Sequence, residues 1–320
     1  MLAVAQHRTD YLGSNKDWSD FVENMSQNSG NAYGETWIAN ARENKSLVKE
    51  CGWITEEQDS YSGKTAVLCG ASQAIRNQFD QLKTILNDPD FVSIGITSGI
   101  KMLIENGITP KYCMMMDASI KQERFWEGMD LNRTKDITLI ASVCTPNELL
   151  KRWKGQIKFL AVMTDYKNAE KKFTRWFYPV NGCGIFFHAL FSQSNMAAAI
   201  AYLVFGMRIL IFVGNELSFP AEDSPYYAGR KDEKDAWKRG KHLDIYGNVV
   251  YTNYMLFSLK LALEDYLGKL PGWYFNCTEA GIFGVSARHG NTPWIQQFKL
   301  NTGIAQAKSI MKTGKPLYLA

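Results

Sequence analysis

The sequence predicts an α/β protein built on a Rossmann-like, mostly parallel sheet with flanking helices and an N-terminal helical extension. From Thr65 onward, short apolar runs alternate with amphipathic segments of helical spacing, which is the rhythm of parallel strands joined by crossover helices. Several runs are apolar at every position, as expected of strands that are covered on both faces. The 320 residues are enough for one large core with appended segments.

Seven segments have the composition of buried strands. They are short and apolar, and most are followed by a glycine or a small polar residue that interrupts the run. The predicted strands are Thr65–Cys69, Phe91–Ile96, Tyr112–Met116, Ile137–Ser142, Ile157–Val162, Ile209–Val213 and Tyr274–Asn276.

Helices are predicted between these strands, where apolar residues recur every three or four positions. One such pattern runs over Ile75–Leu86. Thr97 and Ser98 can cap the following helix, because their hydroxyl oxygens can accept from free N–H groups at a helix start. Thr252 can cap a later helix, which the glycine at Gly268 ends.

We expect the chain to divide into three segments. Residues 1–60 form a helical accessory segment, with helices around Trp18–Met25 and Thr36–Lys49. Residues 61–290 form the Rossmann-like domain, and residues 291–320 form a helical tail.

The charge balance argues against a nucleic-acid-binding protein. The formal net charge is +4, from 36 basic and 32 acidic residues, and the excess is too small and too scattered to form a phosphate-tracking surface. The densest charged stretch, Arg230–Lys241, mixes both signs and is typical of a solvated loop or short helix, although it can also cover an anionic ligand.

Cysteine usage and hydropathy indicate a cytoplasmic protein. The six cysteines are widely spaced without a CxxC pair, as expected of reduced, mostly buried thiols. Residues Met1–Gly13 lack the apolar run of a signal peptide. The apolar stretch Met196–Val213 is long enough to span a bilayer, but Gly206 and Arg208 divide it into a buried helix and a buried strand.

Candidate functional residues follow the predicted strands, because ligands of open parallel sheets bind beyond the carboxyl ends of the strands. Gly70, Ala71 and Ser72 follow the first strand, where close backbone approach, a hydroxyl and free N–H groups suit a phosphate. The same composition is typical of a simple capped turn. There is neither a complete G-x-G-x-x-G nor a Walker lysine pattern.

Two acids follow other strands. Asp117 emerges after the apolar run that ends at Met116, where it can hold a metal ion or a proton, or only cap a helix. Gly214, Asn215 and Glu216 repeat the arrangement after Ile209–Val213. The two carboxylates would lie near one another if their strands are neighbours in the sheet.

A third polar cluster follows the last predicted strand. Asn276, Thr278 and Glu279 precede flexible glycines, and His289 comes shortly afterwards. A lone histidine is usually structural or exposed, but this one is a candidate general base or phosphate ligand. In a separate loop, Tyr227 can stack on a base or sugar.

Taken in order, these motifs resemble a known family. The resemblance rests on Thr65–Ser72, Ser93–Leu103, Asn106–Pro110, Asp117, Gly182–Gly184, Gly214–Leu217, Tyr226–Gly229, Asp244–Thr252 and Asn276–Gly284. They are similar to motifs of the motility accessory factor (Maf) proteins and the archaeal hydroxymethylpterin diphosphokinase-like proteins. Two motifs depart from the family pattern: the usual Gly-Pro-Ser-Leu is Gly70-Ala71-Ser72-Gln73, and the usual Gly-x-Asp-Leu is Gly214-Asn215-Glu216-Leu217.

The resemblance implies a Rossmann-like core related to bacterial sialyltransferases and two alternative chemistries. One is the transfer of a nonulosonic sugar from a CMP donor to a hydroxyl of a protein or small molecule. The other is a diphosphokinase reaction with ATP and magnesium, in which Asp117 and Glu216 would position the metal ion on the ATP phosphates, with Asp117 as the metal ligand. A non-catalytic nucleotide-binding or assembly protein is the third alternative.

In each reading no cofactor is tightly bound, and the donor nucleotide is the main ligand. The residues implied in catalysis are Asp117, Glu216 and His289. Those implied in nucleotide binding are Gly70, Ala71, Ser72, Thr97, Ser98, Gly184, Gly214, Asn215, Tyr227, Asn276, Thr278 and Glu279.

Overall fold

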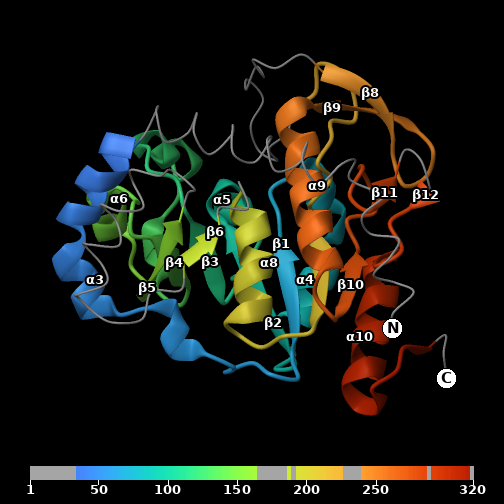
Figure 1. Cartoon of the computed structure of the whole chain (residues 1–320), viewed down its shortest axis with the longest axis horizontal. Coiled ribbons are helices and arrows are strands. Elements are labelled where there is room, and N and C mark those ends of the chain that lie inside the picture. Colours follow the sequence, from blue (N-terminus) through green and yellow to red (C-terminus); the bar gives the residue numbers. More distant parts are fainter. Residues whose placement is uncertain (1–33, 164–185, 189–191, 226–238, 287–289, 318–320) are drawn as a thin grey trace.

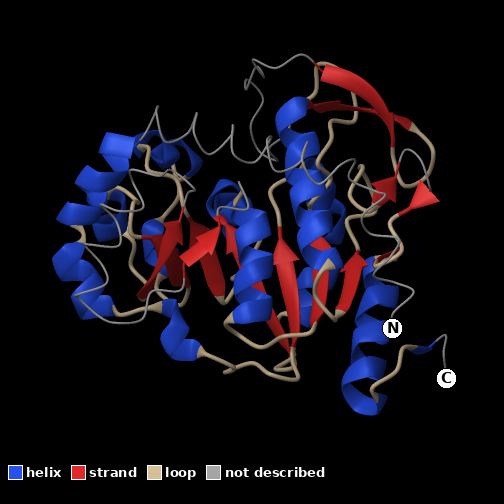
Figure 2. Ribbon diagram, in the orientation of Figure 1, coloured by secondary structure: helices blue, strands red, loops and turns tan. Residues whose placement is uncertain are grey.

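The computed structural model describes residues 34–163, 186–188, 192–225, 239–286 and 290–317. They form a nine-stranded sheet with helices on both faces (Figure 1). The strand order is β13-β10-β7-β1-β2-β3-β4-β5-β6, and every neighbouring pair in this sheet is parallel. The predicted fold class is therefore confirmed, and the arrowheads in Figure 2 point to one edge of the sheet.

All seven predicted strands are present. β1, β2 and β7 have the predicted bounds, and each of the other four differs by one residue at one end. The strands are β1 (Thr65–Cys69), β2 (Phe91–Ile96), β3 (Tyr112–Met115), β4 (Thr138–Ser142), β5 (Ile157–Met163), β6 (Phe186–His188), β7 (Ile209–Val213), β10 (Trp273–Asn276) and β13 (Ile295–Gln297). The sequence did not predict β6 and β13, and β13 contains only one apolar residue, Ile295, in place of an apolar run.

The helices fill the connections between the strands. The α-helices are α3 (Lys45–Cys51), α4 (Phe79–Ile85), α5 (Thr97–Glu105), α6 (Asn147–Arg152), α8 (Gln193–Leu203), α9 (Tyr254–Gly268) and α10 (Leu300–Thr313). Residues 34–43 are also helical, so the helix predicted over Thr36–Lys49 is interrupted at Asn44. Short 3₁₀ helices are η1 (Ile54–Glu57), η2 (Gln73–Gln78), η3 (Ile120–Phe125) and η4 (Leu131–Thr134).

Two small antiparallel pairs stand apart from the main sheet. β8 (Arg239–Leu243) pairs with β9 (Val249–Asn253), and β11 (Val285–Ser286) pairs with β12 (Gly290–Asn291). A bridge between Phe219 and Tyr251 ties the first pair to the segment that follows β7.

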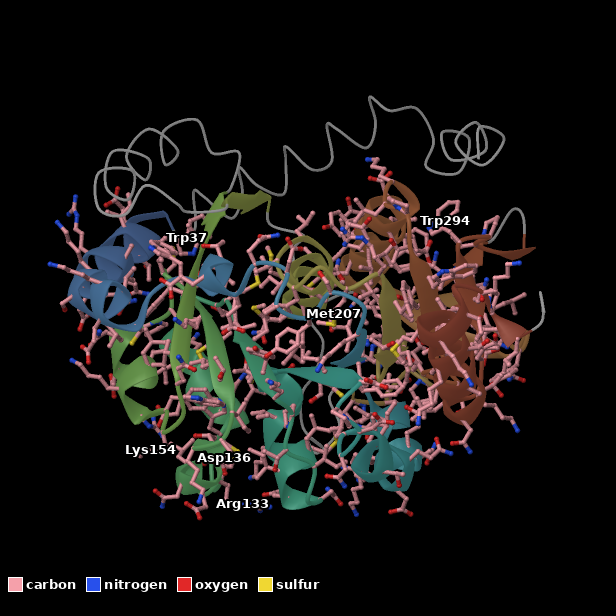
Figure 3. The ribbon with its side chains drawn as sticks, turned by 90° about the horizontal axis from the view of Figure 1, so that it is seen from below. Trp37, Arg133, Asp136, Lys154, Met207 and Trp294 are labelled. Carbon is pink, nitrogen blue, oxygen red and sulfur yellow. The ribbon has the colours of Figure 1, made fainter. Side chains whose placement is uncertain are left out.

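The strands β1, β2, β3 and β7 are buried along their whole length, which explains their mainly apolar sequences. In β1, Ala66 and Leu68 pack in the cluster that contains α8 and α9, whereas Val67 and Cys69 pack in the cluster that contains α4, α5 and α10. Alternation along a strand sends successive side chains to opposite faces. Figure 3 shows side chains filling both layers, with the buried Met207 near the middle of the view.

The apolar stretch Met196–Val213 is divided as predicted. It forms most of α8, then turns at Gly206 and continues as β7. None of the helices in the described parts of the chain has the length and apolar character of a membrane span. The five cysteines among the described residues are free, and four of them are buried.

The tail beyond residue 291 contributes to the core. β13 pairs in parallel with β10, and Leu300, Ala307 and Ile310 of α10 pack in the same cluster as Val67 and Cys69. The exact limits of the three predicted segments stay a prediction.

Two predicted caps are wrong. Thr97 and Ser98 lie inside α5, whose N-cap is the extended Ile96, and the Thr97 hydroxyl bonds elsewhere. The cap of α9 is Asn253, whose side-chain oxygen accepts from the Leu256 N–H at 2.8 Å. The Thr252 hydroxyl instead donates to the Leu217 carbonyl at 3.0 Å.

The turn after β1 predicts a test of this packing. A Cβ at Gly70 would overlap the carbonyl oxygen of Gly214, so Gly70→Ala should lower the free energy of unfolding by about 1–3 kcal/mol. Gly240→Ala is the matched control, because its Cβ meets nothing within 4 Å. Urea denaturation followed by circular dichroism measures both variants, and equal stability of the two would contradict the packing described here.

Candidate functional site

The sheet has one topological switch point, and it lies between β1 and β7. From β1 the chain proceeds outward through β2, β3, β4, β5 and β6, and it then returns to the other side of β1 with β7, β10 and β13. Loops that leave the carboxyl ends of β1 and β7 therefore diverge, which is where open α/β sheets form ligand sites. The register pairs Cys69 with Val213, so the two predicted loops start side by side.

The loops after β1 and β7 are joined by their backbones. The Gly70 N–H donates to the Val213 carbonyl at 2.8 Å, and the Ser72 N–H donates to the Gly214 carbonyl at 3.2 Å. Gly214 adopts a φ of 65°, which favours glycine. Ala71 and Ser72 are buried between these contacts. The predicted Gly-Ala-Ser and Gly-Asn-Glu motifs thus form one structural unit.

Glu216 turns back onto the start of η2. Its Oε1 accepts a hydrogen bond from the Ala74 N–H, and its own N–H donates to the Ser72 hydroxyl at 3.4 Å. The residue is only 5% exposed. Burial raises the pKa of Glu216, whereas the hydrogen bonds from Ala74 and from the Ser72 hydroxyl act in the opposite direction. Its carboxylate therefore occupies the N-terminal turn at which an anion would otherwise be expected.

The buried Asn215 forms hydrogen bonds to β1, β7, α8 and the loop after β10. Its amide nitrogen donates to the carbonyls of Leu68 at 3.3 Å and Val213 at 2.9 Å, and its oxygen accepts from the Ser194 hydroxyl at 2.8 Å. Its backbone N–H donates to the Thr278 hydroxyl at 3.1 Å. Both polar atoms of the side chain bond to protein groups, so Asn215 contributes to the site by holding its loops in place.

The cluster after β10 joins the same network. Asn276 donates from its amide to the Phe283 carbonyl and to Gln297 Oε1, both at 2.9 Å, and its oxygen accepts from the Thr278 N–H. Asn276 and Thr278 are buried, as Asn215 is. Asn276 and Thr278, which were predicted to bind a nucleotide, therefore lie at the switch point. Their side chains bond to other groups of the protein.

Glu279 is the accessible acid of this cluster. It is half-buried, and its Oε1 accepts from the Leu300 N–H at 3.1 Å and from Gln78 Nε2 at 3.5 Å. Its φ is 59°, in the left-handed region that non-glycine residues rarely adopt. Leu217, after Glu216, has a φ of 53°. Leu217 and Glu279 thus both have strained backbones, and strained residues of this kind are typical of functional sites.

The end of β2 meets the start of α8. Gln193 Oε1 accepts both from the Thr97 hydroxyl at 2.6 Å and from the Thr97 N–H at 3.0 Å. Thr97 is buried and Ser98 is half-buried. Sequence reasoning missed Gln193 and Ser194, although the Ser192 that caps α8 marked a helix start in front of the apolar face.

Asp117 lies farther from this centre. It is exposed at the end of β3, and its Oδ1 accepts from the Ser119 N–H at 2.8 Å. β1 and β2 lie between β7 and β3, so the condition for bringing Asp117 beside Glu216 is not met. Three strand spacings place the two strand ends about 14 Å apart. Within the described residues, no group of three His, Cys, Asp or Glu side chains is arranged to hold a metal ion.

Three predicted residues cannot be placed in this site. Gly184, Tyr227 and His289 lie outside the described residues. Their predicted roles stay predictions.

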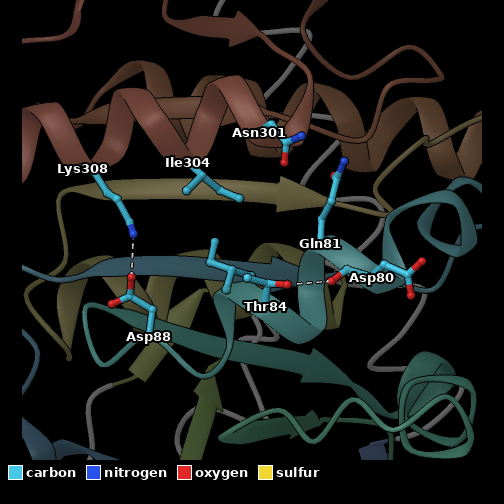
Figure 4. Close-up of a pocket in the computed structure, with 8 residues that line it drawn as sticks. Asp80, Gln81, Thr84, Asp88, Asn301, Ile304 and Lys308 are labelled. Atoms are coloured by element: carbon cyan, nitrogen blue, oxygen red, sulfur yellow. Dashed lines mark hydrogen bonds and ion pairs between the residues drawn. The ribbon is translucent and has the colours of Figure 1, made fainter.

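A separate groove lies between α4 and α10 (Figure 4). It has a volume of about 410 Å³ and contains none of the predicted residues. It is lined by Asp80, Gln81, Thr84, Ile85, Asp88, Asn301, Ile304 and Lys308. An ion pair of 2.8 Å between Lys308 and Asp88 closes one end.

The hydrogen bonds of the Asn215 amide lead to a testable prediction. Asn215→Asp replaces the amide donor that serves two carbonyls, and it should lower the free energy of unfolding by at least about 2 kcal/mol at neutral pH. The loss should shrink at acidic pH, because a protonated carboxyl can again donate to one carbonyl. Asn301→Asp, at an exposed position in α10, is the control. Chemical denaturation at two pH values measures both variants. A loss of stability in Asn215→Asp that does not depend on pH would contradict the proposed role of the Asn215 amide as a hydrogen-bond donor.

Comparisons with known proteins agree with this architecture. The chain is similar to a solved structure described as MAf glycosyltransferase from Magnetospirillum magneticum AMB-1, with a TM-score of 0.56 and 14% sequence identity. The similarity covers 83% of this chain and 43% of that one, so the chain spans less than half the length of that protein. At this identity the likeness concerns the fold. A comparison with curated protein sequences finds no match.

A family model described as 6-hydroxymethylpterin diphosphokinase MptE-like matches residues 35–222. The match runs from the helical segment before α3 to the segment after β7, and it includes both loops at the switch point. Because it spans more than half of the 320 residues, the chain belongs to the MptE-like family.

Proposed function

We propose that this protein is a nucleotide-dependent transferase, and specifically a glycosyltransferase that moves a nonulosonic sugar from a CMP donor to a hydroxyl acceptor. The observation that carries the proposal is the polar assembly at the switch point between β1 and β7. The name of the MAf neighbour supports the glycosyltransferase reading, and the name of the family model supports a transferase that handles a phosphate-containing donor.

The accessible polar groups around the switch point define where the donor binds in this proposal. Ser98 of α5, Gln193 and Ser194 of α8, and Glu279 of the loop after β10 are half-buried. Hydrogen bonds to Thr97, Asn215 and Leu300 hold Gln193, Ser194 and Glu279 in place. A rigid lower layer with an accessible polar rim is the arrangement that positions a nucleotide with little reorganisation. The buried members Ser72, Asn215 and Thr278 then act on the nucleotide through the loops they fix.

The chemistry requires one base and stabilisation of one leaving group. The acceptor hydroxyl oxygen forms a bond to the anomeric carbon of the sugar, and the bond from that carbon to the CMP phosphate oxygen breaks. CMP leaves with the electron pair, which N–H and hydroxyl donors stabilise. The acceptor proton passes to a carboxylate or an imidazole, for which exposed Asp117 and the predicted His289 are the candidates.

The diphosphokinase alternative is favoured by the description of the family model. In its first form, Asp117 and Glu216 together hold magnesium on the ATP phosphates. Two carboxylates on one octahedral magnesium ion, with Mg–O distances of about 2.1 Å, have their bound oxygens about 3–4 Å apart. The separation of β3 from β7 and the burial of Glu216 count against that shared site, which leaves Asp117 as the acid available to a metal.

A nucleotide panel tests the proposal. Specific binding raises the melting temperature, and a ligand at 100 times its Kd adds about 2.7 kcal/mol of stability. We expect CMP and CTP to raise the melting temperature more than ATP, GTP or UDP, with or without magnesium. A magnesium-dependent ATP shift would favour the diphosphokinase, and no shift with any nucleotide would favour a non-catalytic assembly protein.

Asp117 can be tested separately as the base. Asp117→Asn should lower the rate of sugar transfer from CMP about 100-fold or more, because general-base catalysis contributes about that factor. CMP binding, measured by calorimetry, should stay unchanged. Asp136→Asn, at another exposed position, is the control. Full activity of Asp117→Asn would exclude Asp117 as the base.

A further inference from the structure

We propose that Tyr246 and Glu279 recognise the base of the donor nucleotide. The ring of Tyr246 stacks on the base, and the carboxylate of Glu279 accepts a hydrogen bond from the exocyclic amino group of the base. The inference rests on the proposed function and deepens it, because cytosine carries such an amino group and uracil carries a carbonyl oxygen at the equivalent position. The two residues would then be specificity-determining, and not groups that transfer protons.

The turn between β8 and β9 lies on the loops of the switch point (Figure 1). Gly281, in the loop after β10, packs directly on the loop after β7, because a Cβ at Gly281 would overlap the carbonyl oxygen of Glu216. The Gly281 carbonyl in turn accepts from the Ile245 N–H at 3.1 Å. Tyr246 follows Ile245 directly, so the hairpin brings this tyrosine to the switch point.

The backbone that carries Tyr246 is held by hydrogen bonds within the turn. Asp244 Oδ1 accepts from the Tyr246 N–H and from the Asn248 N–H, both at 2.8 Å. Asn248 Nδ2 donates to Asp244 Oδ2 at 3.2 Å, and the Gly247 N–H donates to the Asp244 carbonyl at 3.1 Å. A ligand that stacks on Tyr246 therefore has to order only the side chain and not the turn.

Tyr246 presents an open aromatic face. It is 61% exposed, which is the highest value among the exposed large apolar residues in the described parts of the chain. None of the contacts between aromatic rings in the described residues involves it. A ring this exposed contributes little to the core, whereas an aromatic ring on a fixed turn is well suited to stack on a base.

The Glu279 carboxylate lies near this ring. Glu279 precedes by two residues Gly281, whose carbonyl holds the turn of Tyr246. Partial burial raises the pKa of the Tyr246 hydroxyl, and the negative charges of Glu279 and Asp244 raise it further. The phenol is therefore within electrostatic reach of the Glu279 carboxylate, and a single base can contact both side chains.

Glu279 has one carboxylate oxygen available for a ligand. Its hydrogen bonds within the described residues, from the Leu300 N–H and from Gln78 Nε2, go to Oε1. These bonds orient the carboxylate and leave Oε2 able to accept. A carboxylate accepts hydrogen bonds and cannot donate them when it is ionised, so it favours an amino group and repels a carbonyl oxygen at the same place.

CMP and UMP test the role of Glu279, because they share the ribose and the phosphate and differ only in the base. We expect calorimetry to show that the wild type binds CMP at least about ten times more tightly than UMP. In Glu279→Gln this preference should fall below threefold, because an amide can also donate to the carbonyl oxygen of uracil. The amide oxygen can still accept from the Leu300 N–H. Glu222→Gln, which removes an exposed carboxylate after β7, is the control for net charge and should keep the preference.

Tyr246 is tested by a pair of variants. Tyr246→Ala should weaken CMP binding at least about fivefold, because the stacking of a base on an aromatic ring is lost. Tyr246→Phe keeps the ring and should bind CMP within twofold of the wild type. Val249→Ala, which truncates a 54% exposed side chain of the same hairpin, is the control and should leave CMP binding unchanged. Circular dichroism checks that each variant is folded.

The outcomes separate this inference from the proposed function. Equal affinity of the wild type for CMP and UMP, or an unchanged preference in folded Glu279→Gln, would overturn the inference, and so would unchanged CMP affinity in Tyr246→Ala. The proposed function stands in each of these cases, provided that CMP binds. If CMP binding depends on both residues but the protein transfers no sugar, the proposed function fails and the inference stands. Absence of CMP binding to the wild type would overturn both.

Discussion

Where β1 and β7 end, the backbones of Gly70 and Gly214 lie so close that no Cβ fits between them at position 70. Their contact brings the N–H of Gly70 to Val213 and the N–H of Ser72 to Gly214, and it places Glu216 over the start of η2. Without this approach the two loops would separate, because the chain leaves β1 and β7 in opposite directions. The remaining polar contacts of the site depend on it.

The site has two layers with different physical roles. The lower layer is buried, and its polar side chains satisfy one another or the backbone, as Asn215, Asn276 and Thr278 do. A buried polar network of this kind fixes one arrangement, because breaking any member leaves an unsatisfied group in a poorly solvated place. The upper layer contains the half-buried groups Ser98 and Glu279, which remain accessible to a ligand. Recognition in the proposed transferase therefore belongs to the upper layer, and rigidity belongs to the lower one.

The two acids that the sequence offered as a pair have different environments. Asp117 is exposed at the end of β3, whereas Glu216 is buried at the end of β7 and bonded to the first turn of η2. An exposed carboxylate can exchange a proton with an acceptor, and a buried one that is held by backbone N–H groups acts mainly through its charge and shape. This division is the reason to assign proton transfer to Asp117 and a structural role in joining the loops after β1 and β7 to Glu216.

The sequence by itself predicted the main strands, since continuous apolar runs such as Thr65–Cys69 and Ile209–Val213, interrupted by glycine or polar residues, are typical of strands covered on both faces. It also determined that polar loops follow these strands. Only the tertiary structure decided the strand order, which puts β1 between β2 and β7 and separates Asp117 from Glu216. It alone showed that Gln193 bonds to Thr97, and that the Glu216 carboxylate turns inward. These contacts join residues distant in the chain, and a local pattern contains no information on which distant groups meet.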